Sequence, residues 1–225
     1  MSPAPLVIAI DGPAGSGKST IARMVARALG IAHLDTGAMY RAVTAAAQAA
    51  GADPADEAAV TAVAAGLDLR FSPHGLLVDG EPADGRIRTP AVDRAVSIVA
   101  AHPAIRRLMV ARQRELLARG DAVAEGRDIG TVVYPDAPVK VFLTASIAER
   151  ARRRLGDLEG AGHPTDLAAL EADIAERDRL DSSRAVSPLK PAEDAVVLDT
   201  TGKTPAEVVA EVVAMVRALP EGSRA

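Results

Sequence analysis

Close to its N-terminus the chain carries the segment Gly12-Pro13-Ala14-Gly15-Ser16-Gly17-Lys18-Ser19-Thr20, which fits the pattern G-x-x-x-x-G-K-[ST] at every position. Glycines let successive backbone N–H groups turn toward one anion, and a helix N-terminus adds partial positive charge. A lysine in this place reaches the β- and γ-phosphates of a nucleoside triphosphate. The segment therefore predicts that residues 12–20 bind a nucleoside triphosphate, with Lys18 as a catalytic cation and the Ser19 hydroxyl as a ligand of Mg²⁺, together with the nucleotide's phosphates and water.

The elements on either side of this segment support that interpretation. Residues 6–10 form an apolar run rich in β-branched side chains, which is typical of a buried parallel strand. Residues 21–29 have helical spacing and stop at Gly30, a residue that often ends helices. A strand, a glycine-rich loop and a helix in this order are the context of a P-loop, whereas an ordinary glycine-rich turn would not need the full pattern.

Composition narrows the class of protein. The 225 residues are 48% hydrophobic and 25% charged, as expected for one large globular domain or a core with inserts. A net charge of −4 and 2% aromatic residues disfavour a nucleic-acid-binding ATPase, so arginine clusters must supply anion recognition. The absence of cysteine excludes disulfides and thiolate metal sites, and no basic leader or long apolar stretch is present. We expect a cytoplasmic protein without membrane or nucleic-acid partners, and a monomer.

Apolar runs that alternate with helical segments predict the fold class. Buried strands are expected at residues 6–10, 122–125, 139–143 and 195–199, which implies an α/β fold with a parallel sheet flanked by helices. The carboxyl ends of parallel strands share one edge, where ligands bind. We expect the polar residues that follow strands to gather there, namely Asp11, Gly12, Asp35, Arg127, Asp128 and Asp199.

Residues 67–87 have a different character. They alternate in polarity and contain Asp79-Gly80, a strong hairpin signal, so they predict a small antiparallel β insert. Helices are expected from about Ala38, from Asp53-Pro54, over 90–119 with a break at His102-Pro103, over 146–158 and 166–181, and from Pro205 to Leu219, with a mobile loop at 160–164.

Two arginine-bearing stretches allow two interpretations. Arg150, Arg152, Arg153 and Arg154 lie in one, and Arg177, Arg179 and Arg184 lie in the other. Their i, i+3 and i, i+4 spacings fit solvated helix faces held by salt bridges. Two such helices joined by a glycine-rich loop would also make a lid over transferring phosphates, and the spacing alone leaves both open.

Other candidate groups are ambiguous on local sequence. Asp35-Thr36-Gly37 fits a helix cap better than a substrate contact. The bare tripeptide Gly126-Arg127-Asp128 is also ambiguous between a structural and a substrate-binding role. The four histidines, at positions 33, 74, 102 and 163, are scattered and form no metal-ligand pair, so each is expected to be structural or on the surface. No Asn-Lys-x-Asp motif is present, which argues against a GTPase switch.

Taken together, these segments resemble bacterial cytidylate kinases over nearly the whole chain. The resemblance rests on residues 10–20, Leu-Asp-Thr-Gly-Ala-Met-Tyr-Arg at 34–41, Ile-Arg-Thr at 87–89, Glu-Gly-Arg-Asp-Ile-Gly-Thr-Val-Val at 125–133, Pro-Asp-Ala-Pro-Val-Lys-Val-Phe-Leu at 135–143, Arg-Asp-Arg-Leu-Asp-Ser-Ser-Arg at 177–184 and Ala-Val-Ser-Pro-Leu at 185–189. Many NTPases share the P-loop, but the segments at 34–41 and 125–133 are far more specific.

The resemblance implies transfer of the γ-phosphoryl group of ATP to CMP or dCMP with Mg²⁺, within a P-loop fold that has a monophosphate-binding region and an arginine-bearing helical lid. It implies one kinase domain over 1–225, with a core at about 1–35, 90–145 and 190–219, the monophosphate-binding region with its insert at about 36–89, and a lid at about 150–184. Carried over by position, the CMP-binding residues would be Thr36, Tyr40, Arg41, Arg88, Ser97, Arg106, Arg127, Asp128, Arg177, Asp181 and Arg184.

The resemblance also divides these residues by role. Ser97, Arg106 and Asp128 would read the cytosine base. Arg41 and Arg127 would hold the acceptor phosphate, Asp181 and Arg184 would face the pentose, and the lid residues Arg154 and Arg177 would be catalytic cations. A kinase of the same fold with another acceptor, such as UMP, AMP or shikimate, and a nucleotide-dependent switch ATPase are the alternatives.

Overall fold

The structure, a computed structural model, describes residues 4–72, 75–160 and 166–220. The chain folds into two compact units. The sheet unit comprises Met1–His33 and Asp121–Ala225, and the inserted unit comprises Leu34–Gly120. These units are defined by packing and not by role, so the functional division expected from the sequence stays a prediction.

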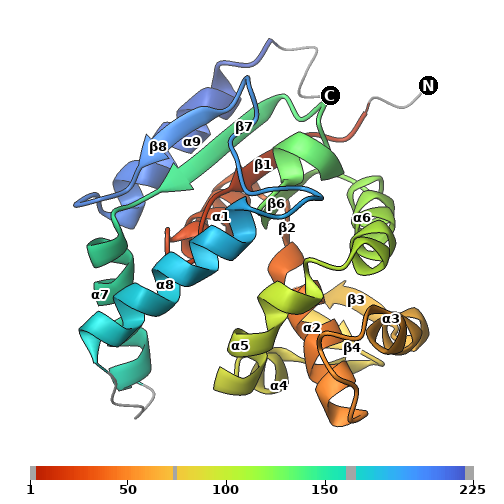
Figure 1. Cartoon of the computed structure of the whole chain (residues 1–225). Helices are drawn as coiled ribbons and strands as arrows, with labels where there is room; N and C mark the ends of the chain where they lie inside the picture. Colours follow the sequence, from red (N-terminus) through yellow and green to blue (C-terminus); the bar gives the residue numbers. More distant parts are fainter. Residues whose placement is uncertain (1–3, 73–74, 161–165, 221–225) are drawn as a thin grey trace. The chain divides into compact units, whose positions relative to one another are not determined.

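A five-stranded sheet forms the centre of the sheet unit (Figure 1). Its order is β2-β6-β1-β7-β8, and β1 pairs in parallel with β6 and β7, as β7 does with β8. The strands are β1 (Val7–Asp11), β2 (Ala32–Asp35), β6 (Ala122–Gly126), β7 (Val139–Thr144) and β8 (Val196–Asp199). The predicted parallel α/β sheet is confirmed, with β2 added at one edge.

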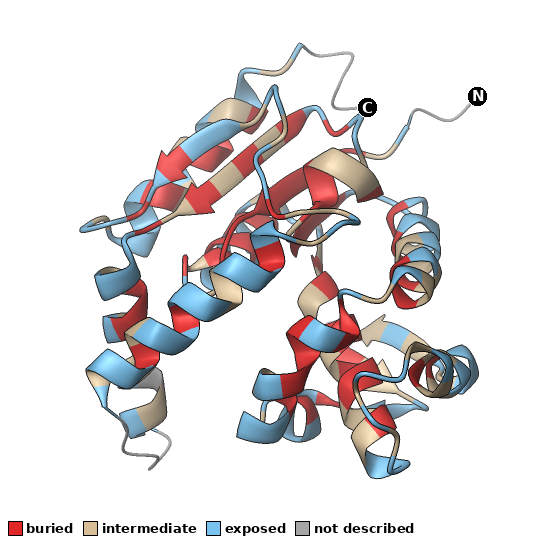
Figure 2. Ribbon diagram, viewed as in Figure 1, coloured by how far each residue is buried: buried red, intermediate tan, exposed pale blue. Residues whose placement is uncertain are grey.

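Burial explains why the central strands are so apolar. All five residues of β1 are buried, as Figure 2 shows for the middle of the sheet. Helices α1 (Lys18–Leu29) and α9 (Pro205–Arg217) pack together and share one core with the sheet. That core includes Ile8, Val25 and Val212, each fully buried. The first and last helices of the chain therefore stabilise the position of β1. This strand leads directly into the phosphate loop, which is the glycine-rich segment at residues 12–17 between β1 and α1.

A pair of helices, α7 (Ile147–Gly160) and α8 (Leu167–Ser182), packs through a small apolar cluster of its own. Ala151, Leu170 and Ile174 are buried there, and burial of a leucine or isoleucine side chain stabilises by about 1.5–3 kcal/mol. Both predicted arginine-bearing helices are thus present. The loop predicted at 160–164 lies outside the described residues except for Gly160, where α7 ends.

Between β6 and β7 the chain forms η1, a π-helix over Ile129–Val133. This element was not predicted, because its sequence is Ile-Gly-Thr-Val-Val, which is typical of a strand. π-Helical turns are rare and are often found at functional sites.

The inserted unit contains helices and a three-stranded antiparallel sheet of order β3-β4-β5. Its elements are α2 (Thr36–Ala49), α3 (Glu57–Gly66), β3 (Leu69–Ser72), β4 (Gly75–Val78), β5 (Glu81–Pro82), α4 (Asp84–Ile87), α5 (Pro90–Val99) and α6 (Pro103–Leu117). Asp79 and Gly80 join β4 to β5 with φ angles of 54° and 85°, as a two-residue type I′ turn requires. The predicted antiparallel insert is confirmed, whereas Pro73 and His74 of its other turn lie outside the described residues.

Two helix starts in this unit test the capping predictions. The break predicted at His102-Pro103 separates α5 from α6. The start predicted at Asp53-Pro54 is wrong, because α3 begins at Glu57 and the Asp56 carboxylate accepts the Ala59 N–H at 3.0 Å. Asp53 instead closes a local turn by accepting the Ala55 N–H at 2.9 Å.

Among the described residues no helix is both long and apolar enough to cross a membrane.

Candidate active site

Glycine is required in the loop between β1 and α1. A Cβ on Gly12 would lie 2.0 Å from the Leu143 carbonyl oxygen of β7, and Gly15 has a φ angle of 76°. The loop ends at Gly17, the N-cap of α1, and no described side chain caps this helix. The first N–H groups of α1 therefore keep their hydrogen-bonding capacity for an anion.

Lys18 is buried directly after this loop, and its Nζ donates to the Pro13 carbonyl oxygen at 2.7 Å. Burial holds the pKa of Lys18 well below its usual range, and the positive charges of Arg127 and Arg177 lower it further against the effect of two nearby carboxylates. Three cations thus act on one another in a region of low dielectric constant. A polyphosphate would neutralise this cluster, which is the chemistry predicted for the segment.

Ser19 follows Lys18, and its hydroxyl donates to Glu125 Oε2 at 2.7 Å. A hydroxyl that donates its proton keeps two lone pairs with which it can bind a cation. Within the described residues, no group of three or more His, Cys, Asp or Glu side chains could hold a metal ion alone. Mg²⁺ is typically held by one or two protein groups, substrate phosphates and water, so Ser19 fits the predicted role.

Asp11 lies at the carboxyl end of β1 and joins this strand to η1. Its carboxylate accepts the Ile129 N–H at 2.9 Å and the Gly130 N–H at 2.8 Å. Burial raises the pKa of Asp11 to about 6, although these two hydrogen bonds lower it, and the charge of Asp128 adds to the increase. The sequence placed Asp11 at the ligand-binding edge of the sheet but gave no sign of its η1 partners.

The ends of β6 and α8 bring several predicted residues together. Arg127 Nε donates to Asp181 Oδ2 at 3.0 Å, and Arg184 Nη2 lies 3.4 Å from Asp181 Oδ1. Burial alone would raise the pKa of Asp181, but Arg127, Arg184 and Arg177 together hold it below its usual value. Asp128, the residue after Arg127, is 5% exposed. The predicted CMP-binding residues of the sheet unit thus form a charged cluster. Two of its members, Arg127 and Arg177, also act electrostatically on Lys18.

Arg150 was not predicted to contribute to the site, yet it is the most firmly held arginine of α7. Its guanidinium group donates to the Ala14 carbonyl oxygen in the phosphate loop at 3.1 Å and to both Asp178 carboxylate oxygens at 3.0 and 2.5 Å. Nε also donates to the Ala145 carbonyl oxygen at 3.0 Å. This side chain therefore connects the phosphate loop to α7 and α8.

The other arginines of these helices divide between the two interpretations left open above. Arg152 pairs with Glu149 and Arg179 pairs with Glu176, each at i, i+3 on an exposed surface, as expected for a solvated face. Arg153 Nε also pairs with Glu149 at 3.1 Å, but its guanidinium group donates in addition to the Thr200 hydroxyl at 3.0 Å and to the Thr200 carbonyl oxygen at 2.8 Å. Arg154 lies half-buried on α7 and its catalytic role stays a prediction.

The predicted arginines of the inserted unit are paired with carboxylates. Arg41 Nη1 lies 2.6 Å from Asp93 Oδ1, and Arg88 Nη2 donates to Asp35 Oδ2 at 2.9 Å. Asp35 also accepts the Ala38 N–H at 2.9 Å, so the helix-cap interpretation of this residue is confirmed. Each of these ion pairs restricts the orientation of its guanidinium group.

The remaining predicted residues of this unit are largely buried. Arg106 lies over the Tyr40 ring with its Cζ 5.6 Å from the ring centroid, a cation–π contact. Arg106 Nη1 also donates to the Ala100 carbonyl oxygen at 3.2 Å. Thr36 begins α2, and Ser97 is buried on α5. Their roles in binding a base stay predictions.

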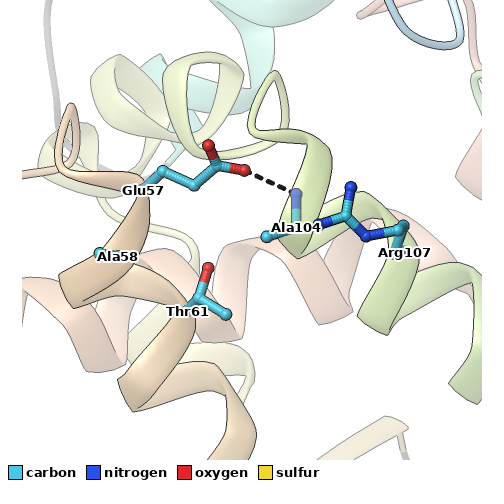
Figure 3. A pocket seen from close by; sticks show the side chains of 5 residues that line it. All are labelled: Glu57, Ala58, Thr61, Ala104 and Arg107. Atoms are coloured by element: carbon cyan, nitrogen blue, oxygen red, sulfur yellow. Dashed lines mark hydrogen bonds between the residues drawn. The ribbon is translucent and has the colours of Figure 1, made fainter.

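A separate pocket of the inserted unit contains none of the predicted site residues. Glu57, Ala58 and Thr61 of α3 line it together with Ala104 and Arg107 of α6 (Figure 3). The Glu57 carboxylate accepts the Ala104 N–H at 2.6 Å, so this side chain caps the start of α6. The charged residues described above therefore remain the candidate active site.

Comparison with known proteins identifies the family of the chain. The family model described as "Cytidylate kinase" matches residues 8–218. A "Bifunctional pantoate ligase/cytidylate kinase" of Synechococcus sp. (strain WH7803) is 55% identical over 202 residues, which are 87% of this chain and 41% of the relative. The protein of the same name from Prochlorococcus marinus (strain MIT 9313) is 50% identical over 217 residues, which are 94% of this chain and 43% of the relative. The chain thus spans less than half the length of these curated relatives.

One solved structure supports the fold alone. An uncharacterized protein from Eubacterium ventriosum has a TM-score of 0.54 at 10% sequence identity, and the match covers 95% of this chain and 99% of that one. The family match, in contrast, extends from β1 to Ala218, the residue directly after α9, and includes the phosphate loop. The chain belongs to the cytidylate kinase family.

Proposed function

We propose that this chain transfers the γ-phosphoryl group of ATP to CMP or dCMP, giving ADP and CDP or dCDP. The observation that carries the proposal is the cluster of Lys18, Arg127 and Arg177 at the glycine-rich loop, where burial and mutual repulsion depress the pKa of the lysine. A site built this way lowers its electrostatic energy when it binds several phosphate charges. Family membership supports CMP as the acceptor.

The reaction requires that the two substrates be positioned and that the negative charge on the transferred phosphoryl group be neutralised. An oxygen of the CMP phosphate forms a bond to the γ-phosphorus of ATP while the bond from this phosphorus to the oxygen bridging the β-phosphate breaks, and ADP leaves with that electron pair. The acceptor oxygen is already anionic, so no general base is needed. We assign charge neutralisation on the transferred group to Lys18, Arg154 and Arg177, since cations that are fixed beforehand lower the barrier most.

Magnesium would be held by the Ser19 hydroxyl together with ATP phosphates and water. When bound, this ion supplies charge neutralisation on the phosphate oxygens. The hydrogen bond from Ser19 to Glu125 supports this role, because it orients the hydroxyl proton away from the space in which a cation would bind.

CMP recognition is proposed for residues of both units. Arg41 and Arg127 would hold the acceptor phosphate, for which planar guanidinium groups are well suited. Ser97, Arg106 and Asp128 would read the base, and Asp181 with Arg184 would contact the pentose. Thr36, Tyr40 and Arg88 would complete the binding residues. The carboxylate partners of Arg41, Arg88 and Arg127 support preorganisation of these groups.

The acceptor assay that tests this proposal measures ADP release from Mg-ATP with CMP, dCMP, UMP, AMP or GMP. We expect strong stimulation by CMP and dCMP only. Stimulation by a different monophosphate would overturn the roles given to Ser97, Arg106 and Asp128. Slow ADP release that no monophosphate stimulates would contradict a kinase and favour the switch ATPase.

A further inference from the structure

Behind the phosphate loop, three side chains of the sheet unit form a continuous hydrogen-bonded chain. The Ser19 hydroxyl donates to Glu125 Oε2 at 2.7 Å, and Glu125 Oε1 lies 2.9 Å from His33 Nε2. Ser19 is the second residue of α1, and Glu125 is the last residue but one of β6. His33 lies on β2, the strand next to β6 in the sheet. Side-chain exposure is 4% for Glu125 and 20% for His33.

The donors and acceptors in this row of hydrogen bonds follow from the chemistry of the three side chains. A carboxylate accepts hydrogen bonds at both oxygens, so His33 donates from Nε2 and Ser19 donates from its hydroxyl. With both Glu125 oxygens engaged, the carboxylate plane cannot rotate without losing a hydrogen bond in a buried place, at a cost of about 1–3 kcal/mol. The Ser19 hydroxyl proton is thereby kept pointing at Glu125. The lone pairs of the hydroxyl oxygen remain available on the opposite side of that oxygen.

We propose that His33 is a positioning residue for the magnesium ligand Ser19 and that it acts through Glu125. This inference rests on the proposed function, since it assumes that Ser19 binds Mg²⁺ together with the nucleotide. His33 itself contacts neither nucleotide nor metal. Groups that orient a metal ligand typically contribute 10- to 100-fold to metal affinity. The histidine predicted from the sequence to be structural or on the surface thus tunes the nucleotide site.

Without His33, Glu125 loses the hydrogen bond at Oε1 and gains freedom to rotate. Its carboxylate could then turn away from the Ser19 hydroxyl, whose lone pairs would no longer have one fixed direction. Phosphate binding by the backbone of the loop and by Lys18 does not depend on that direction. We therefore expect the loss of His33 to weaken binding of the magnesium–nucleotide complex and to leave binding of the metal-free nucleotide almost unchanged.

The test measures the dissociation constant of a non-hydrolysable ATP analogue by calorimetry, once with Mg²⁺ and once with EDTA. H33L should raise the constant roughly 10-fold with Mg²⁺ and by less than about twofold with EDTA. H33Q should restore most of the affinity, because the glutamine amide can donate from a similar position. H102L is the matched control, since His102 also makes a side-chain hydrogen bond, to the Pro54 carbonyl oxygen at 2.8 Å, but has no link to Ser19.

A double-mutant cycle tests the route through Glu125. E125A/H33L should bind the magnesium–nucleotide complex no more weakly than E125A does, because without the Glu125 carboxylate His33 has nothing left to orient. Equal losses for H33L with Mg²⁺ and with EDTA, or additive losses in the cycle, would overturn the inference. H33A replaces H33L in every comparison if H33L does not fold.

Failure of the proposed function is distinguishable from failure of this inference. If Mg²⁺ does not change the affinity of the wild-type protein for the analogue, the magnesium assignment and the role of His33 are both wrong. If the His33 effect is present but CMP does not stimulate ADP release, the acceptor assignment fails and the positioning role stands.

Discussion

Lys18 and Asp11 flank the same glycine-rich loop, and burial shifts the pKa of each toward its neutral form. The consequences differ because their partners differ. Asp11 has two backbone N–H donors from η1, so its carboxylate is satisfied inside the protein. Lys18 has one carbonyl partner and two repelling arginines, so its charge is left for a ligand to neutralise. One buried group thus supports the fold and the other supports binding.

The first prediction concerns Lys18. Lys18→Met should lower kcat roughly 10²- to 10³-fold, because it removes a fixed cation from the transferred phosphoryl group. The thermal midpoint should stay the same or rise, since the substitution removes a buried charge that costs free energy. Steady-state kinetics and thermal unfolding check both parts, and near-normal turnover would rule out the catalytic assignment.

The second prediction concerns the pH dependence of stability. Folding raises the pKa of Asp11 from 3.8 to about 6, so the native state binds this proton more tightly than the unfolded state does. The stability contributed by the protonated form is fully present below pH 3.8 and is lost as the pH rises through 6. Between pH 4 and 7 the wild-type protein should therefore lose about 2 kcal/mol relative to D11N. Urea unfolding at several pH values checks this, and parallel profiles for the two proteins would contradict it.

The third prediction concerns base recognition. Asp128→Ala should raise the KM for CMP roughly 10- to 100-fold, since a charged hydrogen bond to the base is lost, and should change the KM for ATP by less than about twofold. Steady-state kinetics with each substrate varied in turn provides the measurement. Equal increases in both values would remove Asp128 from the base-reading residues.

At the residue scale, the part of the candidate site that could be predicted is the part whose residues are neighbours in the sequence. The phosphate loop is contiguous, so its residue types identify it. Arg150 and Arg152 are two positions apart on one helix, yet Arg150 is 4% exposed and anchored whereas Arg152 lies at the surface. Partners distant in sequence, Ala14 and Asp178, make that difference, and no spacing rule predicts them.

Among the elements, the helix pair α7–α8 depends on few apolar contacts and on the Arg150 hydrogen bonds. Arg150→Met should destabilise the protein by about 1.5–3 kcal/mol, because Asp178 and the Ala14 carbonyl oxygen lose a charged donor. It should also raise the KM for ATP, because the phosphate loop loses a fixed contact. Urea unfolding and steady-state kinetics provide the measurements.

Arg152→Met is the matched control, since it removes an arginine from the same helix that pairs only with Glu149 at the surface in the described residues. It should change stability by less than about 0.5 kcal/mol. Equal effects of the two substitutions would show that Arg150 does not connect the loop to the helices.

The elements themselves were mostly predictable because their signals are local. Apolar runs, the Asp79-Gly80 turn and the Pro103 break all lie within the segments that they shape. The π-helix η1 is the exception. Its β-branched sequence favours a strand, but Asp11, 118 residues away from Ile129, binds its first two N–H groups. Tertiary contacts here overrode local propensity.

At the scale of the whole molecule, ATP and CMP are proposed to bind different sets of residues. The residues proposed for ATP and Mg²⁺ all belong to the sheet unit, whereas those proposed for CMP belong to both units. Hydrolysis of ATP would need the first set alone, but transfer to CMP needs both. Water competes with CMP as the acceptor, so a kinase must favour transfer strongly over hydrolysis.

The most direct test of this account follows the γ-phosphoryl group itself. ATP labelled at the γ-phosphate would be mixed with the protein, Mg²⁺ and CMP, and labelled CDP and labelled inorganic phosphate would be separated and counted. The account predicts that nearly all transferred label appears in CDP and that removing CMP nearly abolishes label transfer. Label that appears mainly as inorganic phosphate, whether or not CMP is present, would contradict it.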